Sequence, residues 1–375
     1  MTASGIYAHL PYCRSRCGYC AFVVSTDDST SAAYWRALHR EMELLREEAA
    51  GAAFDTLYLG GGTPSLVAAA DLERLLEGLR TSFEVSPDAE VTLEANPEDV
   101  TPELARAWAR AGISRVSVGV QSFADRELSA VGRRHDSARA AGAIETLAAL
   151  GFSLSGDLIL GLPEQTRESF RESLSRLAGS GVGHVSVYLL EAEKSRLIEE
   201  DRRGHPERYL SDDAQADLWL EMGETLASRG FRHYEISNWA APGREARHNV
   251  KYWKRTPTLG IGVSAHELWS GRRRANVAAL PRYIEELEAG RRPLAADRPL
   301  DAEEERRERI FLGLRLAEGV PSGDFAEAVL ESGDPTLAGD REAWLENGLL
   351  EEEAGRVRFT ERGYLLSNEI LCRFV

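Results

Sequence analysis

Short apolar runs alternate with longer amphipathic stretches from residue 5 to about residue 265. Runs with the pattern of β-strands begin at seven positions: Gly5, Thr56, Ala89, Arg115, Ser155, His184 and His233. Stretches rich in Ala, Leu, Arg and Glu separate them, for example 32–50, 102–111, 137–150 and 213–229. This strand–helix alternation predicts an α/β fold with a parallel sheet. At least six such units favour a partial (β/α)6 barrel, similar to part of a TIM barrel, with functional residues where strands end.

The pattern changes after about residue 300. The periodicity there predicts helices over 303–316, 325–330 and 340–346, then a hairpin over 349–363 and a last helix through Cys372. Three helices and a hairpin suggest a small, mostly helical, winged-helix-like domain. We therefore expect three parts, listed in chain order: a barrel core over 1–240, a closing region over 241–299, and a C-terminal domain over 300–375.

The charge balance argues against nucleic acid as a partner. The 375 residues carry a net charge of −16, and residues 301–375 hold nine Arg and no Lys against eighteen Asp or Glu. Phosphate binding needs an excess of basic side chains. The C-terminal domain is therefore expected to pack against the barrel or a protein partner. The first residues lack the pattern of a signal peptide, and no apolar segment of about 18 residues occurs, so a cytoplasmic protein is the plain expectation.

Three of the four cysteines lie close together directly after the first predicted strand. Their spacing is Cys-x3-Cys-x2-Cys, formed by Cys13, Cys17 and Cys20, and Gly18 allows a tight turn. Three thiolates can each bond one iron of a cubane cluster and leave the fourth iron open for chemistry. The alternatives are a structural zinc site, with His9 as a fourth ligand on paper, or three unrelated buried cysteines. The isolated Cys372 is expected to be a buried apolar residue of the last helix.

The segment from Tyr7 to Cys20, YAHLPYCRSRCGYC, resembles the cluster loop of the radical S-adenosylmethionine (SAM) superfamily. Its YxHxPYC start is similar to the branch that contains the oxygen-independent coproporphyrinogen oxidases. The resemblance implies the radical SAM type of partial barrel, a [4Fe-4S] cluster on Cys13, Cys17 and Cys20, and SAM at the iron left open. It also implies one-electron cleavage of the sulfonium to a 5′-deoxyadenosyl radical, a step that the cofactor carries.

Polar and glycine residues near the ends of the later strands resemble the SAM site of this superfamily. The GGGTP segment from Gly60 is similar to the loop that meets the methionyl ammonium group. SAM offers ribose hydroxyls and an ammonium, which suit carboxylates, and a carboxylate, which suits a guanidinium. Residue-by-residue similarity implies this cofactor role for Tyr7, Tyr19, Gly61, Gly62, Thr63, Glu94, Gln121, Arg133 and Asp157. Taken singly, each has a plain alternative as a turn, a surface charge or a barrel residue.

The segment from His248 to Trp253 reads HNxxYW and resembles a signature of the radical SAM haem chaperones. The resemblance implies a haem site formed by His248, Asn249, Tyr252 and Trp253. His248 can supply an axial nitrogen, and Tyr252 and Trp253 can stack on the macrocycle. Nearby cations can meet the haem propionates: Arg247, Lys251, Lys254 and Arg255. The alternative is a core histidine with satisfied hydrogen bonds. His266, in the Gly-rich segment from Gly260, is a further candidate contact.

Two departures separate this chain from the coproporphyrinogen oxidases that it resembles. Phe22 stands where those enzymes carry a further cysteine, and only six residues precede Tyr7. Both argue against decarboxylation of coproporphyrinogen. The resemblance thus implies a haem chaperone that delivers haem to an acceptor such as a respiratory haem protein. It would use the cluster and SAM structurally or for regulation. A homodimer and transient contact with the membrane are further expectations. The alternative from another class is a true radical enzyme, oxidase-like or a methyltransferase, which would need an electron donor.

Overall fold

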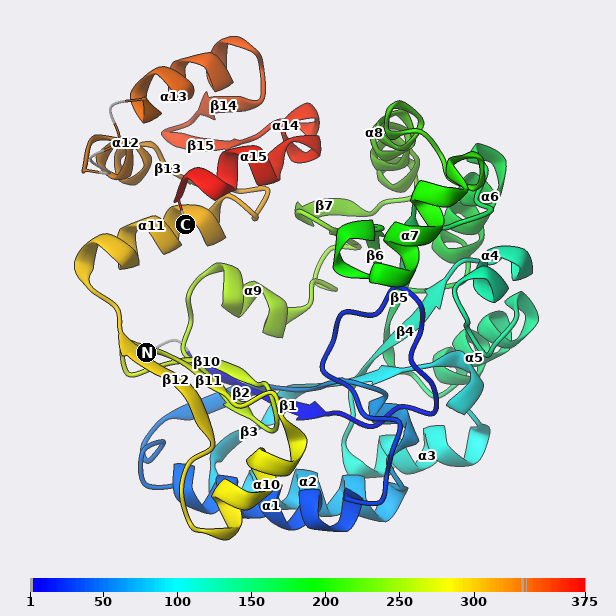
Figure 1. Cartoon of the computed structure of the whole chain (residues 1–375), viewed down its shortest axis with the longest axis vertical. Coiled ribbons are helices and arrows are strands. Elements are labelled where there is room, and N and C mark those ends of the chain that lie inside the picture. The colour runs from blue at the N-terminus through cyan, green and yellow to red at the C-terminus, as the bar shows by residue number, and fades with distance from the viewer. Residues whose placement is uncertain (1–2, 332–333, 335, 375) are drawn as a thin grey trace.

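The structure is a computed structural model that describes residues 3–331, 334 and 336–374. Six strands lie parallel and in chain order within one sheet (Figure 1): β1 (Ser4–Leu10), β2 (Ala53–Gly61), β3 (Glu84–Ala95), β4 (Arg115–Gln121), β5 (Ser153–Leu160) and β6 (His184–Leu189). The predicted partial barrel of six parallel strands is confirmed. Because these strands are parallel, their carboxyl ends meet at one rim, and loops at that rim come together.

Helices cover the outer face of this sheet: α1 (Ser31–Leu45), α2 (Ala69–Ser82), α3 (Pro102–Ala111), α4 (Asp125–Ala130), α5 (Ser137–Ala149) and α6 (Arg167–Ala178). The α3 helix shows how the sequence sets their limits. Thr101 caps its start by accepting a hydrogen bond from the Leu104 N–H at 3.2 Å. It ends at Gly112, whose φ of +89° is left-handed. The helix therefore spans the predicted 102–111.

The strand predicted at His233 does not continue the parallel series. It forms β7 (Arg232–Glu235), which pairs antiparallel with β8 (Asn238–Ala240), and β8 pairs antiparallel with β6. Only two residues separate β7 from β8, so the chain reverses in a hairpin, whereas a parallel connection would need a crossover helix. Two helices, α7 (Arg196–Gly204) and α8 (Asp212–Ser228), lie between β6 and β7.

The region after β8 extends the same sheet at its other edge. There β9 (Thr258–Ile261) pairs parallel with β1, and three antiparallel strands follow: β10 (His266–Trp269), β11 (Arg272–Asn276) and β12 (Leu294–Pro299). The region also contributes α9 (Arg247–Trp253) and α10 (Leu280–Glu288). Figure 1 shows α9 between the barrel sheet and the C-terminal helices. The HNxxYW segment is therefore a short helix placed at a junction.

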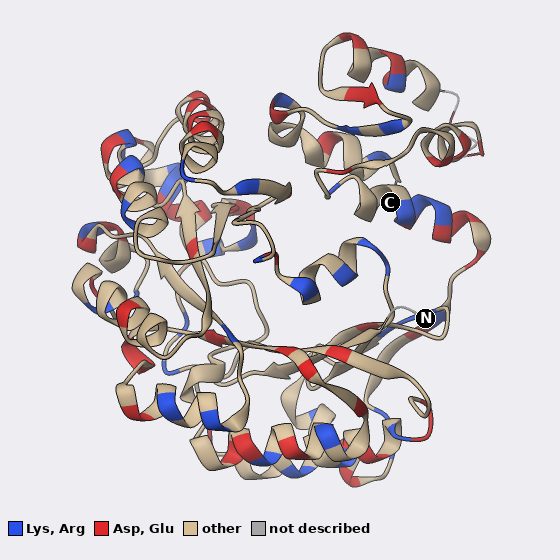
Figure 2. Cartoon of the chain, turned by 180° about the vertical axis from the view of Figure 1, so that it is seen from behind, with Lys and Arg blue, Asp and Glu red and all other residues tan. Residues whose placement is uncertain are grey.

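The C-terminal part has the predicted winged-helix-like content. Its helices are α11 (Ala302–Gly313), α12 (Ser322–Glu331), α13 (Leu337–Glu346), α14 (Glu361–Leu365) and α15 (Ser367–Leu371), and its small sheet has β13 (Val320–Pro321), β14 (Leu350–Glu353) and β15 (Arg356–Phe359). It contacts the barrel where the Tyr364 ring lies 4.5 Å from that of His233. Figure 2 shows acidic and basic residues interspersed over its helices.

One prediction about this part is wrong: Cys372 is exposed rather than buried. The last α-helix ends at Leu371, and Cys372 begins a short 3-10 turn in which its thiol donates to the Glu369 carbonyl at 3.1 Å. Among the described residues, no helix combines the length and the apolar character needed to cross a membrane.

A buried carboxylate joins α1 to three places in the region from β9 to α10. Glu41 has no exposed surface and accepts from the Gly262 N–H at 2.7 Å, from Asn276 Nδ2 at 2.6 Å and from the Tyr283 hydroxyl at 2.6 Å. Burial raises its pKa to about 7, and the three donors only partly oppose that rise. The folded state therefore holds this proton more tightly than the unfolded chain does.

We expect Glu41 to make stability depend on pH. Because its folded-state pKa is raised, its stabilising contribution is full below its ordinary pKa of 4.5 and is lost as pH rises through about 7. The free energy of unfolding of the parent should fall by roughly 2 kcal/mol more than that of Glu41→Gln between about pH 5 and about pH 8. Urea titrations measure this, with exposed Glu43→Gln on the same helix as the control. If the free energy of unfolding changed with pH equally in the parent and in Glu41→Gln, the raised pKa of Glu41 would be contradicted.

Candidate functional site

The three clustered cysteines lie on one loop, the cysteine loop (residues 11–30), which joins β1 to α1. Its backbone is fixed over the ends of the parallel strands. The Thr63 N–H donates to the Tyr12 carbonyl at 3.0 Å, and the Gly18 N–H donates to the Val131 carbonyl at 3.0 Å. All three thiols are half-buried and form no disulfide: Cys13, Cys17 and Cys20. The loop therefore lies where barrel folds build their sites.

Two hydrogen-bond donors point at the cysteine sulfurs. Thr63 Oγ1 donates to Cys13 Sγ at 3.2 Å, and Arg133 Nη1 lies 3.8 Å from Cys17 Sγ. Burial raises the pKa of the Cys13 thiol, and the hydrogen bond from Thr63 opposes that rise. Donors of this kind favour thiolate sulfur, the form that bonds iron. The loop and its surroundings therefore fit the predicted cluster.

The arrangement does not resemble a site for one metal ion. The described residues bring together no group of three His, Cys, Asp or Glu side chains that could hold a single ion. A cubane cluster differs because each cysteine bonds a different iron. His9, the candidate fourth zinc ligand, has both ring nitrogens engaged, with the Tyr7 hydroxyl at 3.0 Å and the Val23 carbonyl at 2.9 Å.

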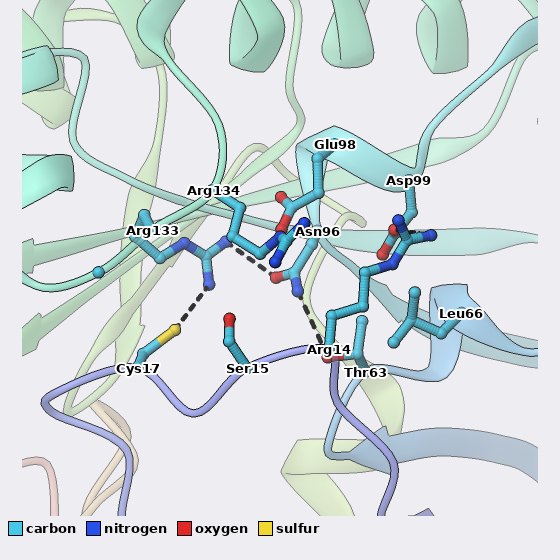
Figure 3. Close-up of a pocket in the computed structure, with 11 residues that line it drawn as sticks. Arg14, Ser15, Cys17, Thr63, Leu66, Asn96, Glu98, Asp99, Arg133 and Arg134 are labelled. Atoms are coloured by element: carbon cyan, nitrogen blue, oxygen red, sulfur yellow. Dashed lines mark hydrogen bonds and ion pairs between the residues drawn. The ribbon is translucent and has the colours of Figure 1, made fainter. Parts of the chain in front are cut away.

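A pocket opens beside Cys17, between the cysteine loop and the rim of the barrel (Figure 3). Its lining includes Arg14, Thr63, Leu66, Asn96, Glu98, Asp99 and Arg133. Arg133 donates to Asn96 Oδ1 at 2.8 Å and to the Gly119 carbonyl at 2.6 Å, and its guanidinium points toward Cys17. Its Nε is buried without a partner in the described part of the chain. A carboxylate is the group that such a guanidinium binds best.

The glycines after β2 have a packing role that the sequence does not reveal. A Cβ on Gly61 would lie 2.5 Å from the His9 ring, and one on Gly62 would lie 2.7 Å from the Pro11 carbonyl carbon. Gly61 also has a φ of +113°. The start of the cysteine loop can pack against the end of β2 only because both positions lack a side chain.

Two carboxylates of raised pKa lie inside the barrel. Glu94 accepts from the Tyr58 hydroxyl at 2.8 Å and from the Gly61 N–H at 3.0 Å, and burial raises its pKa to about 7. Asp157 accepts from Ser117 Oγ at 3.0 Å, and burial also raises its pKa. Carboxylates perturbed in this way are typical of binding and catalytic sites.

The remaining predicted cofactor residues lie at a strand end, inside the barrel or at the cysteine loop. Gln121 at the end of β4 has a φ of +66°, a strained conformation for a residue with a side chain and one found often at functional sites. The Tyr7 ring lies 6.0 Å from that of Tyr58, beside Glu94. Thr63 and Arg133 contact the cysteine loop, and Arg133 donates there to the Tyr19 hydroxyl.

His248 is the fully buried residue of α9, and its ring is held at both ends. Nδ1 shares a hydrogen bond with Thr56 Oγ1 at 2.9 Å, and Nε2 shares one with the Tyr252 hydroxyl at 2.8 Å. Burial lowers its pKa to about 3, so the ring is neutral. This is the geometry of a core histidine. An axial bond to iron remains a prediction, and it requires one of these hydrogen bonds to open.

The other predicted haem contacts are distributed around α9. Asn249, Tyr252 and Trp253 are half-buried. The four cations expected to meet propionates all have carboxylate partners: Arg247 and Lys251 pair with Asp55, Lys254 with Glu318, and Arg255 with Glu308. His266 is exposed on β10, where it pairs with Ala275 of β11.

Two residues of the site were not found from the sequence. Tyr58 connects the two halves of the site, because its hydroxyl bonds Glu94 and its ring lies 5.3 Å from that of His248. Asn96 receives Arg133 and approaches Thr63. The available signal for Asn96 was its position directly after β3, at a strand end where functional residues were expected, whereas Tyr58 lies inside β2 and no motif marked it.

Comparisons with known proteins find similarity over nearly the whole chain. The model of the radical SAM superfamily matches residues 7–177, and that of the HemN C-terminal domain matches residues 300–366. A haem chaperone HemW from Mycobacterium tuberculosis is 36% identical over 98% of this chain and 93% of its own length. The HemW of Bacillus subtilis is 31% identical over 98% of both. The structure of Escherichia coli coproporphyrinogen III oxidase, HemN, superposes with a TM-score of 0.84 at 23% identity, covering 99% of this chain and 90% of that one.

Proposed function

Because this chain belongs to the HemW haem chaperone family of the radical SAM superfamily, we propose that it binds haem at α9 and delivers it to an acceptor protein. The observation that carries this proposal is the position of α9. Its His248 ring packs against Tyr58, and Tyr58 bonds a carboxylate of the expected cofactor site. A haem on α9 would therefore lie next to the cofactor, in one connected site.

The cysteine loop holds the [4Fe-4S] cluster in this proposal, with Cys13, Cys17 and Cys20 as ligands. Arg133 binds the SAM carboxylate, because its buried Nε still lacks a partner. The remaining contacts come from the rim and the interior of the barrel: Tyr7, Tyr19, Gly61, Gly62, Thr63, Glu94, Gln121 and Asp157. One-electron cleavage of the sulfonium is the chemistry that the cluster supplies when bound, while the chain orients SAM and excludes water.

His248 supplies the axial nitrogen to haem iron, and it does so by exchanging the Tyr252 hydroxyl for the metal. The neutral ring suits this role, because only an unprotonated nitrogen binds iron. Thr56 continues to hold Nδ1 and so fixes the ring orientation, as outer partners of metal-bound histidines do. Tyr252 and Trp253 then offer aromatic surface to the macrocycle, and Asn249 directly follows His248 on the same helix.

A chaperone and a porphyrin-converting enzyme differ in how they use SAM. We expect formation of 5′-deoxyadenosine by the reduced, cluster-loaded chain to be slow and unchanged when coproporphyrinogen III is added. Phe22 supports this expectation, because it is 65% exposed where the oxidases that this chain resembles carry a cysteine. Chromatography of anaerobic reactions with and without the porphyrinogen measures the difference. A rise in 5′-deoxyadenosine that follows substrate consumption would overturn the proposal in favour of a radical enzyme.

A further inference from the structure

Arg315 lies where the C-terminal part meets α9. It follows α11, and its carbonyl accepts a hydrogen bond from the Ile236 N–H at 2.9 Å, which ties this segment to the barrel. Its guanidinium carbon lies 5.1 Å from the ring centroid of Trp253 and 5.0 Å from that of Phe311. Two aromatic rings therefore hold the side chain against the helix that carries the HNxxYW segment.

The charge of Arg315 is not neutralised within the described residues. No carboxylate there lies within the 4.0 Å of an ion pair, and its buried Nε has no hydrogen-bond partner. Burial lowers the pKa of Arg315, while the charges of Glu235 and Glu191 act in the opposite direction. Glu235 forms no ion pair with it; one oxygen of its carboxylate accepts from the Ser237 N–H at 3.2 Å and from the Asn238 side chain.

This isolation distinguishes Arg315 from the other cations around α9. The four cations on or next to that helix are paired with carboxylates, at distances of 2.6 to 3.0 Å: Arg247, Lys251, Lys254 and Arg255. An incoming anion would have to displace a carboxylate from any of these, but not from Arg315. A half-buried guanidinium without a partner binds the carboxylate of an incoming ligand more favourably than a cation that already has a carboxylate partner.

We propose that Arg315 binds a propionate carboxylate of the haem carried on α9. This inference rests on the proposed function and adds the residue that recognises the free carboxylates of the haem. The stack on Trp253 brings the charge next to an aromatic ring expected to meet the macrocycle. At the end of β6, Tyr188 and Leu189 are 44% and 40% exposed, and the charge of Glu235 acts on both Tyr188 and Arg315. Apolar surface and one unpaired guanidinium together match an amphipathic porphyrin.

The test compares haem with haem dimethyl ester, in which both carboxylates are blocked. The cluster-loaded parent should bind haem roughly 10- to 100-fold more tightly than the ester, the range for a hydrogen bond to a charged group. Arg315→Gln should lose most of that preference by weakening haem and leaving the ester nearly unchanged. Arg315→Lys keeps the charge without the planar fork and should lie between the two. Anaerobic absorbance titrations measure all six affinities.

The matched control is Arg309→Gln, an exposed arginine of α11 that lies 3.9 Å from Asp324 and should keep the parental preference. Cluster content and thermal melting identify any variant that fails to fold. If Arg315→Gln fails to fold, the comparison of haem with its ester is made on Arg315→Lys. An equal loss for haem and ester in the Arg315 variants would overturn the proposal and assign a packing role. Unchanged haem affinity would also overturn it. Absence of haem binding by the parent would instead contradict the proposed function itself.

Discussion

Cys17→Ala is expected to lose the iron–sulfur cluster. The cysteine loop offers three thiolates for three irons, and two thiolates do not hold the cubane in place. Iron after anaerobic reconstitution should fall from about four per chain to less than about one, with loss of the visible thiolate-to-iron absorbance. The same result is expected for Cys13→Ala and Cys20→Ala, because all three lie on the same fixed loop.

The chain contains its own control for this experiment. Cys372 is exposed in the last turn of the C-terminal part, far along the chain from the cysteine loop, so Cys372→Ala should keep full iron content and the parental spectrum. If Cys17→Ala retained about four irons, or if Cys372→Ala lost them, the ligand assignment would be wrong.

His248→Ala is expected to weaken haem binding by at least about 100-fold, because loss of outer partners alone already costs a metal site 10- to 100-fold. Tyr252→Phe should act in the opposite direction. It keeps the aromatic ring but removes the hydroxyl that holds His248 Nε2 at 2.8 Å. Since a neutral hydrogen bond contributes about 0.5–1.5 kcal/mol, haem affinity should rise roughly 2- to 10-fold.

Because the two variants are expected to change haem affinity in opposite directions, they distinguish iron ligation from simple damage to the fold. His248 is fully buried, so its replacement also leaves Thr56 without a partner and costs stability, which thermal melting would reveal. Damage alone would weaken binding in both variants. Parental affinity in His248→Ala, or weaker binding in Tyr252→Phe with an intact fold, would exclude His248 as the axial ligand.

The features that the sequence predicts well are those carried by short-range patterns. The six parallel strands and helices such as α3 follow from periodicity and from caps such as Thr101, which lie within a few residues of what they control. The cysteine spacing likewise lies within eight residues. The hairpin of β7 and β8 was missed because its direction depends on a two-residue connection, which an apolar pattern does not report.

The features that the sequence does not predict depend on contacts between distant residues. His248 is bonded to Thr56, 192 positions away, so the sequence could not distinguish a core histidine from a free ligand. The pairing of Arg247 and Lys251 with Asp55 has the same origin. In the sequence, Arg315 is an ordinary arginine near the end of a predicted helix. Only its tertiary position between Trp253 and Phe311 identifies it as a candidate haem contact.

The measurement that tests the central claim most directly is an anaerobic haem titration of the cluster-loaded chain, followed by absorbance. A haem carrier with one site on α9 predicts saturable binding at about one haem per chain, with the spectrum of a histidine-bound haem. Binding that does not saturate, or no specific binding while the cluster is intact, would contradict the account.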